Sequence, residues 1–337
     1  MKANTVAIDV GYGNTKTAVR IGAGISTNMF PSLAPMWVPS ALSEYGQGAL
    51  VARNVKPIDV GGAKFEVGPD VPLTSAYGNT GRTLSEDFVT TQCYDALLGG
   101  ALTYAGVREV ERLVLGLPVH TTKKYSQLLK DRFTRSFDFG HGKVNIRSVL
   151  VVPQPVGALV AHAQYAGAEF SADHTNLIID VGYFTTDWVV ATGFAMDDRR
   201  SGGLPGGASH IYRQIASAIA HAEDQGVDEI ERIDNCLRSN KPFFFHDRDI
   251  DLTPYLLAAR PFIESTVKEL QSRVGRASDI RSIVLAGGGS NLYEPVVRAA
   301  FPGKRIKLMD APCYANVKGF LLVGESAHAR ERKKAAV

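Results

Sequence analysis

The sequence lacks the features that mark secreted and membrane-spanning proteins. Its three cysteines, Cys93, Cys236 and Cys313, lie far apart, so they predict neither a disulfide framework nor a metal-ligand pair, and they suit a reducing cytoplasm. No apolar run approaches the ~20 residues that a membrane-spanning helix needs. The first residues, MKANTVAIDV, contain one basic residue and then enter a predicted strand, unlike a signal peptide. We therefore expect a cytoplasmic protein without membrane contact.

The sequence also has little net charge. A formal charge of +3 over 337 residues gives no reason to expect direct nucleic-acid binding. The tail ARERKKAAV, residues 329–337, is locally basic and is interpreted as a solvated helix end, with contact to an acidic partner or DNA as the alternative. Hydrophobic residues make up 45% of the chain, which is typical of a globular protein with a large core. The length allows one large domain or two medium ones.

What the sequence does contain is an alternation of strand and helix patterns. Residues 5–10 and 16–21 predict a hairpin, and residues 53–71 predict another with Gly61-Gly62 at its turn. A helix is predicted over 85–106, with Ser85 as its N-cap. The remaining elements are a strand at 111–119 followed by a helix, a strand, turn and helix over 144–167, a hairpin over 175–194, helices over 207–224 and 264–275, and a strand, glycine turn and helix over 282–302. Residues 226–252 are left unassigned. This order predicts α/β domains with mixed sheets.

One pattern occurs twice: VAIDVGYGNTK at 6–16 and LIIDVGYFTTDW at 177–188. Two copies in similar settings indicate duplicated halves that face a shared site. In the first copy, Gly11 and Gly13 allow a tight turn whose N–H groups can bind an anion, together with Asn14 and Thr15, and Lys16 adds positive charge. Asp9 would repel a phosphate directly, so its expected role is to hold a hydrated Mg²⁺. A plain β-hairpin turn is the alternative.

The second copy offers the same chemistry. Asp180 suits a water-mediated Mg²⁺ ligand, and Gly182, Thr185 and Thr186 suit phosphate contacts. Asp187 is either part of this site or a plain turn residue.

Two further glycine-rich segments are candidates for the same ligand. In AGGGSN, residues 286–291, Gly287, Gly288, Gly289 and Ser290 permit close approach to a flat ring or sugar before a helix N-terminus. In GGLPGGASH, residues 202–210, Gly206 and Gly207 either line the ribose side or simply lead into a helix.

Gln154, in VVPQPVGALVAHA at 151–163, stands between two prolines at a strand-to-helix turn. A glutamine held there can orient a water in line with a phosphorus atom, and capping of the turn is the alternative.

The ordered set of these motifs resembles the actin-type ATPase superfamily. By that resemblance the first hairpin is the phosphate-1 loop, VVPQPVGA is connect 1, the second hairpin is phosphate 2, LAGGGSN is the adenosine motif, and DAPCYANVKGFLLVG (310–324) is connect 2. The segments DVGGAKFEVG, LGLPV and PQPVGA are similar to the ParM/StbA group, which segregates plasmids. The sequence departs from that group at Gln154, where ParM-type proteins often carry Glu.

The resemblance implies an actin-like (ribonuclease H-like) two-domain α/β fold, with mixed five-stranded sheets and a nucleotide cleft between the domains. Domain I would span 1–165, with the C-terminal helix 313–337 returning to it, and domain II would span 166–312. The implied ligands are ATP or GTP and Mg²⁺, the latter held through water by Asp9 and Asp180, and Gln154 would position the attacking water. The implied partners are other copies of the chain in a filament and a DNA-binding adaptor protein, without direct nucleic-acid contact.

Two other functions stay open at this point. A small-molecule kinase of the same superfamily would need an extra carboxylate as base, and no clear candidate follows the fourth strand. A non-polymerising ATP-dependent scaffold would keep the nucleotide site without filament formation.

Overall fold

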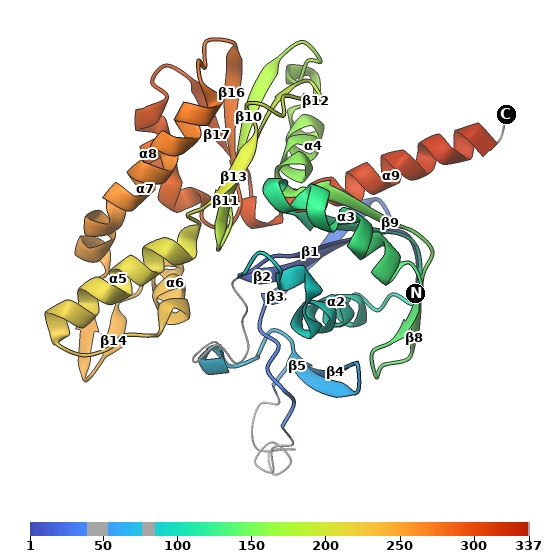
Figure 1. The fold of residues 1–337 in the computed structure, drawn as a ribbon, viewed down its shortest axis with the longest axis horizontal. Coiled ribbons are helices and arrows are strands. Elements are labelled where there is room, and N and C mark those ends of the chain that lie inside the picture. The colour runs from blue at the N-terminus through green and yellow to red at the C-terminus, as the bar shows by residue number, and fades with distance from the viewer. Residues whose placement is uncertain (39–52, 76–84, 336–337) are drawn as a thin grey trace. The chain divides into compact units, whose positions relative to one another are not determined.

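The structure is a computed structural model that describes residues 1–38, 53–75 and 85–335 (Figure 1). The chain forms two compact units. Unit 1 consists of Met1–Leu117, Thr121–Val152 and Phe320–Val337, and unit 2 consists of Pro118–His120 and Pro153–Gly319. The sequence-based boundary near residue 165 differs from this division, since helix α4 (Gln154–Ala166) belongs to unit 2. Its apolar residues pack on the sheet of that unit, which explains the difference.

Unit 1 is built on a mixed sheet. Its strands are β1 (Lys2–Val10), β2 (Asn14–Ile21), β3 (Gly24–Pro31), β6 (Glu109–Leu117), β7 (Ser136–Asp138), β8 (Lys143–Ile146) and β9 (Val149–Pro153). They lie in the order β3-β2-β1-β6-β8-β7, and β9 also pairs with β6. The first three strands are antiparallel, whereas β1 and β6 are parallel. A separate hairpin, β4 (Lys56–Val60) and β5 (Ala63–Val67), turns at Gly61 and Gly62 with positive φ, which confirms the predicted turn.

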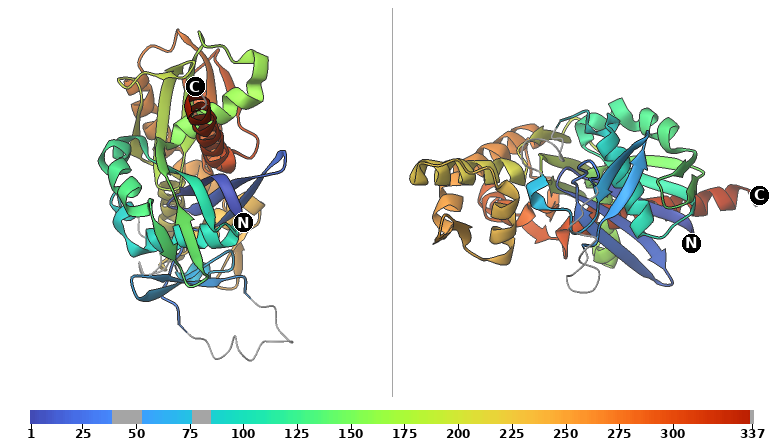
Figure 2. Two further views of the ribbon diagram at one scale, coloured as in Figure 1. Left: turned by 90° about the vertical axis from the view of Figure 1, so that its right-hand side faces the viewer. Right: turned by 90° about the horizontal axis from the view of Figure 1, so that it is seen from below.

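Helices cover both faces of the unit 1 sheet (Figures 1 and 2). Val6 and Ile8 face a core that includes α2 (Gln92–Tyr104) and α3 (Val119–Phe133). On the other face lies the second part of α9 (Ala315–Ala335), drawn in red, where a Cβ at Gly324 would lie 2.6 Å from side-chain atoms of Thr5 and Val114. Asp9 has the same parity as Thr5 along β1, so it points to this second face.

Unit 2 repeats the scheme. Its strands are β10 (Thr175–Val181), β11 (Thr185–Thr192), β12 (Ala195–Met196), β13 (Gly202–Pro205), β16 (Ile280–Ala286) and β17 (Arg305–Leu308). The order is β12-β11-β10-β16-β17, and β13 pairs with β11. Strands β10 and β11 are antiparallel, and β10, β16 and β17 are mutually parallel neighbours.

The alternation of side chains along β10 separates two cores. Leu177, Ile179 and Val181 pack with α5 (Ala208–Glu223), α7 (Thr253–Val274) and α8 (Ser290–Ala300). Ile178 packs on the opposite face with residues of α4. Asp180 shares the parity of Ile178 and therefore points to the α4 face of the sheet.

The elements that differ from the sequence predictions are few. The sheets contain seven and six strands within the described residues instead of five, because short edge strands such as β7 and β12 extend a common core. The N-cap of α2 is Thr91, whose hydroxyl accepts from the amide of Tyr94 at 3.2 Å, and not Ser85. The unassigned residues 226–252 contain α6 (Ile230–Ser239) and a hairpin of β14 (Phe243–Phe245) and β15 (Arg248–Ile250). Among the helices of the described residues, none combines the length and the hydropathy of a membrane span.

Candidate functional site

The two repeated motifs form hairpins with the same register. In unit 1, Asp9 pairs with Lys16 and Val10 pairs with Thr15 across β1 and β2. In unit 2, Asp180 pairs with Asp187 and Val181 pairs with Thr186 across β10 and β11. Each hairpin therefore places a carboxylate at the end of its first strand and closes with a loop of the same length. The resemblance between the two sequences is a resemblance of backbone geometry.

The first residue of each loop is a glycine for a steric reason. A Cβ at Gly11 would lie 3.1 Å from the carbonyl oxygen of Asn14, and a Cβ at Gly182 would lie 3.0 Å from that of Thr185. Both distances are shorter than an ordinary contact, so a side chain would open the turn. Within the second loop, the amide of Gly182 donates to the Thr185 oxygen at 2.9 Å, which closes it.

Ser32, at the end of β3, braces the first loop. Its amide donates to the carbonyl oxygen of Gly13 at 3.0 Å, and its hydroxyl donates to that of Gly11 at 2.5 Å. The Thr15 hydroxyl is buried and lies 2.9 Å from the Ser32 hydroxyl. These carbonyl oxygens are bound from the β3 side, which favours presentation of the loop's amides on the other side. The Thr15 side chain is bonded to Ser32. The phosphate contact predicted for Thr15 is therefore expected from its backbone amide.

Asp9, which is buried, and Lys16, which is half-buried, form an ion pair beside this loop. The Lys16 ammonium donates to the Asp9 carboxylate at 3.1 Å, and the two side chains are 14% and 2% exposed. The predicted cation of the first loop therefore has an anionic neighbour directly opposite it on the sheet.

The N-terminus of α5 and the segment before it brace the second loop. The amides of Ala208 and Ser209 donate to the oxygens of Gly182 and Tyr183 at 3.0 and 2.8 Å, and the Gly206 and Gly207 amides donate to that of Phe184. Every carbonyl oxygen from Gly182 to Thr185 thus accepts a hydrogen bond. A Cβ at Gly207 would lie 2.6 Å from the Tyr183 oxygen, so the close approach requires glycine there.

This arrangement gives four of the predicted site residues a structural role within unit 2. Gly206 and Gly207 lie against the second loop and support it, and the ribose contact expected of them stays a prediction. The Thr186 hydroxyl is buried and donates to the Gly206 oxygen at 3.0 Å, which holds the loop in place, and the phosphate contact expected of Thr186 stays a prediction. Thr185 is also buried, 5% exposed, at the start of β11.

Asp180 is enclosed at the end of β10. Its Oδ2 accepts from the side-chain amide of Asn316, in α9, at 2.7 Å. A Cβ at Gly287 would lie 2.3 Å from its Oδ1, so the first glycine of the AGGGSN segment makes room for the carboxylate. Asp187 is likewise buried, with its Oδ1 accepting from the Val119 amide at 2.9 Å and lying 3.8 Å from His120 Nδ1.

The two tyrosines that follow the glycines tether their loops. The Tyr12 hydroxyl donates to the Ser85 carbonyl oxygen at 2.9 Å, and its ring stacks on Phe88 with centroids 5.4 Å apart. The Tyr183 hydroxyl donates to the Glu231 carboxylate, in α6, at 2.9 Å. The repeated tyrosine is thus structural in both units.

The segment of three glycines forms the turn from β16 into α8. Gly287 has φ of 85°, its amide donates to the Pro312 oxygen, and the Gly289 amide donates to that of Val181. The Ser290 hydroxyl is buried and donates to the Gly287 oxygen at 2.8 Å. A Cβ at Gly289 would lie 2.7 Å from the Val181 side chain, whereas one at Gly288 would meet only Arg238, at 3.4 Å. Gly288 is therefore the glycine of the three that is least enclosed.

Arg238, in α6, is held over that glycine by two polar neighbours. Its Nε donates to the Asp234 carboxylate at 2.6 Å, and the Tyr212 hydroxyl donates to the same oxygen at 2.5 Å. Burial and the Asp234 charge raise the pKa of Tyr212 well above its ordinary value, so the phenol stays protonated. The guanidinium has a fixed orientation, which suits contact with a flat ring or a polar ligand edge.

Gln154 is the first residue of α4. It follows Pro153, whose extended backbone precedes the helix, and it is half-buried in unit 2. The predicted strand-to-helix turn is confirmed, since β9 ends at Pro153. The catalytic role of Gln154 stays a prediction.

The carboxylates fit a hydrated magnesium ion. No group of three or more His, Cys, Asp or Glu side chains that could hold a metal occurs in the described parts of the chain. Mg²⁺ prefers oxygen ligands, keeps several waters and commonly takes only one or two carboxylates. A single buried carboxylate at each strand end, Asp9 and Asp180, agrees with that donor set.

Several residues of the site carry no local signal in the sequence. Ser32, Asn316 and Arg238 act on loops that are distant in the sequence, as shown by the separation of 136 residues between Asn316 and Asp180. Asn316 lies in the segment predicted as connect 2, but its contact with the carboxylate follows only from the fold.

Comparisons with known proteins agree with this geometry. Residues 7–157 match the family model of the N-terminal domain of actin-like proteins, and residues 178–299 match that of the C-terminal domain of the archaeal actin homologue MreB-like family. A comparison with curated protein sequences gives no match.

Solved structures give matches over nearly the whole chain. A ParM subunit from a 15-stranded filament of Clostridium botulinum is 22% identical, covers 97% of this chain and 100% of its own, and has a TM-score of 0.78. The archaeal actin homologue Ta0583 in complex with ADP is 21% identical, with 96% and 99% coverage and a TM-score of 0.74. AlfA from a filament bound to AMPPNP is 15% identical, with 98% and 99% coverage and a TM-score of 0.61. Both halves of the chain thus match actin-like family models, and the complete fold matches actin homologues. The chain contains an actin-like N-terminal domain and an MreB-like C-terminal domain by sequence, and it has the actin-like two-domain α/β fold seen in ParM-type proteins.

Proposed function

We propose that this protein binds ATP, or GTP, with Mg²⁺ through the two repeated hairpins, hydrolyses it and assembles into filaments. The observation that carries the proposal is the common register of the hairpins. Each places a buried carboxylate, Asp9 or Asp180, beside a loop whose carbonyl oxygens accept bonds from the protein. Two such loops, with amides as donors, suit a chain of phosphates.

The role proposed for each residue follows from the charge of its group. The backbone from Gly11 to Thr15 and from Gly182 to Thr186 would bind phosphate oxygens. Lys16 would share its charge between Asp9 and the phosphates. Asp9 and Asp180 would hold Mg²⁺ through water, and the ion would neutralise phosphate charge when bound.

Two further parts would complete the site. Gln154, at the start of α4, would orient the attacking water, since phosphoryl transfer depends mainly on positioning and charge stabilisation. The segment Gly287 to Ser290 would flank the base, with Arg238 as the neighbouring cation over Gly288.

Filament formation is supported by the relatives. The ParM and AlfA structures named above are filaments, and the AlfA filament contains a nucleotide analogue. By the same likeness we propose a role in plasmid or DNA segregation through an adaptor protein that binds the DNA. The low net charge of +3 agrees with indirect DNA contact.

The substitution Asp180→Ala tests the nucleotide site. We expect ATP turnover, measured as phosphate release in the presence of Mg²⁺, to be abolished. The matched control is Asp198→Ala, which removes an exposed carboxylate elsewhere in unit 2 and should leave turnover unchanged. An unchanged rate in the Asp180 variant would contradict the proposal.

Light scattering and electron microscopy test assembly separately. We expect scattering to rise with ATP and Mg²⁺ above a critical protein concentration, and filaments to be visible with a slowly hydrolysed ATP analogue. Turnover without any assembly would favour the non-polymerising scaffold, and transfer of phosphate to a metabolite in a substrate screen would favour the kinase.

A further inference from the structure

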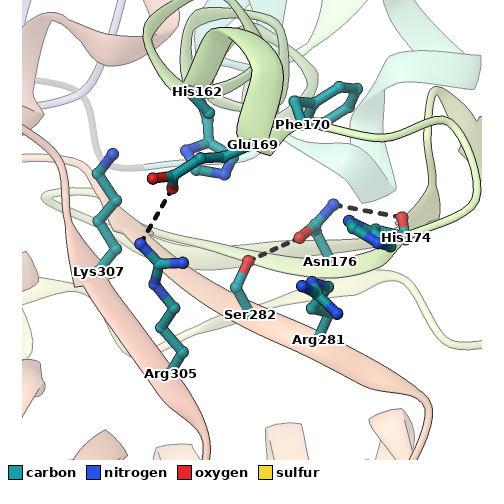
Figure 3. A pocket seen from close by; sticks show the side chains of 10 residues that line it. His162, Glu169, Phe170, His174, Asn176, Arg281, Ser282, Arg305 and Lys307 are labelled. Atoms are coloured by element: carbon teal, nitrogen blue, oxygen red, sulfur yellow. Dashed lines mark hydrogen bonds and ion pairs between the residues drawn. The ribbon is translucent and has the colours of Figure 1, made fainter.

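Unit 2 has a basic pocket at the edge of its sheet where β10 and β16 begin (Figure 3). Helix α4 and the turn η3 (Gly167–Glu169) lie over it, and the strands form its floor. The residues that define the pocket chemically are His162, Glu169, Asn176, Arg281, Arg305 and Lys307. Apart from Asn176, which lies in β10, these residues are outside the two hairpins described above.

The pocket carries an excess of positive charge. It contains three cations and one carboxylate, a net charge of +2 when the histidines are counted as neutral. Glu169 is bonded to Arg305 at 3.0 Å, and both side chains are exposed at the rim. Arg281 and Lys307 have no ion pair with any residue in the described parts of the chain, although Lys307 is half-buried. Two cations without a counterion, close to a third, make the pocket electropositive, so it favours an anion.

His162 supplies a second and independent sign of a ligand. Its side chain projects from α4 toward the pocket, and the residue is only 7% exposed (Figure 3). Its Nδ1 is buried and has no hydrogen-bond partner within the described residues. Phe170 packs edge-on against the His162 ring, with the two ring centroids 6.3 Å apart, and this contact fixes the orientation of the imidazole. Buried polar atoms are almost always bonded, so this nitrogen indicates an ordered water or a ligand group beside the ring.

The floor of the pocket is polar and ordered. Asn176 is 4% exposed, accepts from the Ser282 hydroxyl at 2.6 Å and donates to the His174 carbonyl oxygen at 3.3 Å. The pocket has a volume of about 40 Å³. A water molecule needs roughly 10–15 Å³ by the same measure, so the space matches about three waters or one tetrahedral oxyanion.

We propose that this pocket is a binding site for a phosphate dianion, either inorganic phosphate or the phosphate group of a small monoester. Arg281 and Lys307 supply the charge, the His162 ring supplies a nitrogen donor, and the Asn176 amide orders the floor. The net charge of +2 matches the dianion, and the volume of the pocket accommodates one tetrahedral oxyanion.

Within unit 2, the site is separate from the proposed phosphate loop at Gly182–Thr185. Asn176 and Asp180 point to the same face of β10, but they lie four residues apart, roughly 13 Å along the strand. The proposal therefore does not depend on nucleotide binding, and the two sites are changed by different variants.

Calorimetric titration of the full chain with inorganic phosphate, at constant ionic strength, tests the site. We expect saturable binding that weakens at least tenfold in the double variant Arg281→Gln/Lys307→Gln. The matched control, Arg276→Gln/Lys268→Gln, removes the same charge from exposed positions of unit 2 outside the pocket and should bind phosphate as the wild type does. The variant His162→Gln should also weaken phosphate binding. The histidine signal that is present in the NMR spectrum of the wild type and absent from that of this variant belongs to His162.

Titrations with other anions distinguish specific phosphate binding from general attraction of anions. Phosphate should shift the assigned His162 resonance, whereas chloride at equal ionic strength should not. A glycerol phosphate titration identifies the source of the dianion: tighter binding than phosphate indicates a small monoester, and weaker binding indicates inorganic phosphate. Equal loss of affinity in both double variants, or a His162 shift with chloride alone, would overturn the proposal, because either result means general attraction without a site.

Discussion

Asp180 and Asp187 lie directly opposite each other across β10 and β11, although both carboxylates are buried. Like charges in such cross-strand pairs destabilise a sheet. Here each carboxylate is bound by a different donor: the Asn316 side chain for Asp180, and the Val119 amide for Asp187. In the first hairpin the same position is taken by the oppositely charged pair of Asp9 and Lys16. The two hairpins share their backbone and differ in how charge is balanced.

Removal of the Asp187 carboxylate should destabilise unit 2. In Asp187→Ala the Val119 amide loses its acceptor, which we expect to lower the free energy of unfolding by about 1–3 kcal/mol. Asp187→Asn should cost less, since one oxygen can still accept. Denaturant unfolding followed by the fluorescence of the adjacent buried Trp188 measures both. Equal losses for the two variants would show that the hydrogen bond to Val119 is not what Asp187 contributes.

The Asp9–Lys16 ion pair should be strongly coupled. Lys16→Met leaves a buried carboxylate without its cation, and we expect a loss of about 3 kcal/mol in unfolding free energy. The double variant Asp9→Asn/Lys16→Met should lose less than the sum of the single variants. A double-mutant cycle from denaturant unfolding measures the coupling. Additive losses would mean that the two side chains act independently.

The glycines of the turn before α8 should differ in their tolerance. Gly287→Ala places a Cβ 2.3 Å from Asp180 Oδ1 at a backbone φ of 85°, so we expect a loss of more than about 2 kcal/mol. Gly288→Ala meets only the end of Arg238 at 3.4 Å and should change stability by less than about 1 kcal/mol. Thermal unfolding compares the two. Similar melting temperatures would contradict the packing described here.

Stability should fall in acid partly through His162. Burial, followed by the charges of Lys307 and Arg305, lowers the pKa of His162 below its ordinary value of 6.5, and Glu169 opposes this shift. As the pH falls through 6.5, the unfolded chain therefore takes up a proton before the folded chain does, and the free energy of unfolding decreases.

The variant His162→Gln isolates this effect. The loss of stability between about pH 7.5 and about pH 5.5 should be smaller in the variant than in the wild type. Denaturant titrations at both pH values measure it. An identical pH dependence would show that His162 does not contribute.

The parts of the fold that could be predicted are those determined by neighbouring residues. Alternating apolar residues and turn glycines correctly predicted both repeated hairpins, and Gly61 and Gly62 correctly predicted a third. The N-cap predicted for α2, Ser85, was wrong. Ser85 and Thr91 both have a hydroxyl that can cap a helix, and only the packing of the folded helix selects Thr91. The hairpin of β14 and β15 was missed because its turn uses His246 and Asp247 with positive φ, without glycine or proline.

The supports of the site could not be predicted for a different reason. Ser32 and Asn316 hold loops of the site through contacts that only the folded chain creates. Thr15 and Thr186, which the sequence suggests as phosphate ligands, form hydrogen bonds to Ser32 and to the Gly206 oxygen that the sequence did not predict. A hydroxyl beside a glycine turn can serve either purpose, and the residue type does not distinguish them.

The common register of the hairpins also limits how this protein can change during evolution. Side chains alternate between the two faces of a strand, so inserting one residue after Gly11 or Gly182 and shifting the pairing would turn Lys16 or Asp187 to the opposite face. Substitutions in the loops are sterically limited at Gly11 and Gly182, whereas a shift of the pairing by one residue would separate Asp9 from Lys16. The spacing of seven residues from Asp9 to Lys16, and from Asp180 to Asp187, is therefore the feature that we expect homologues to keep even where the letters between have diverged.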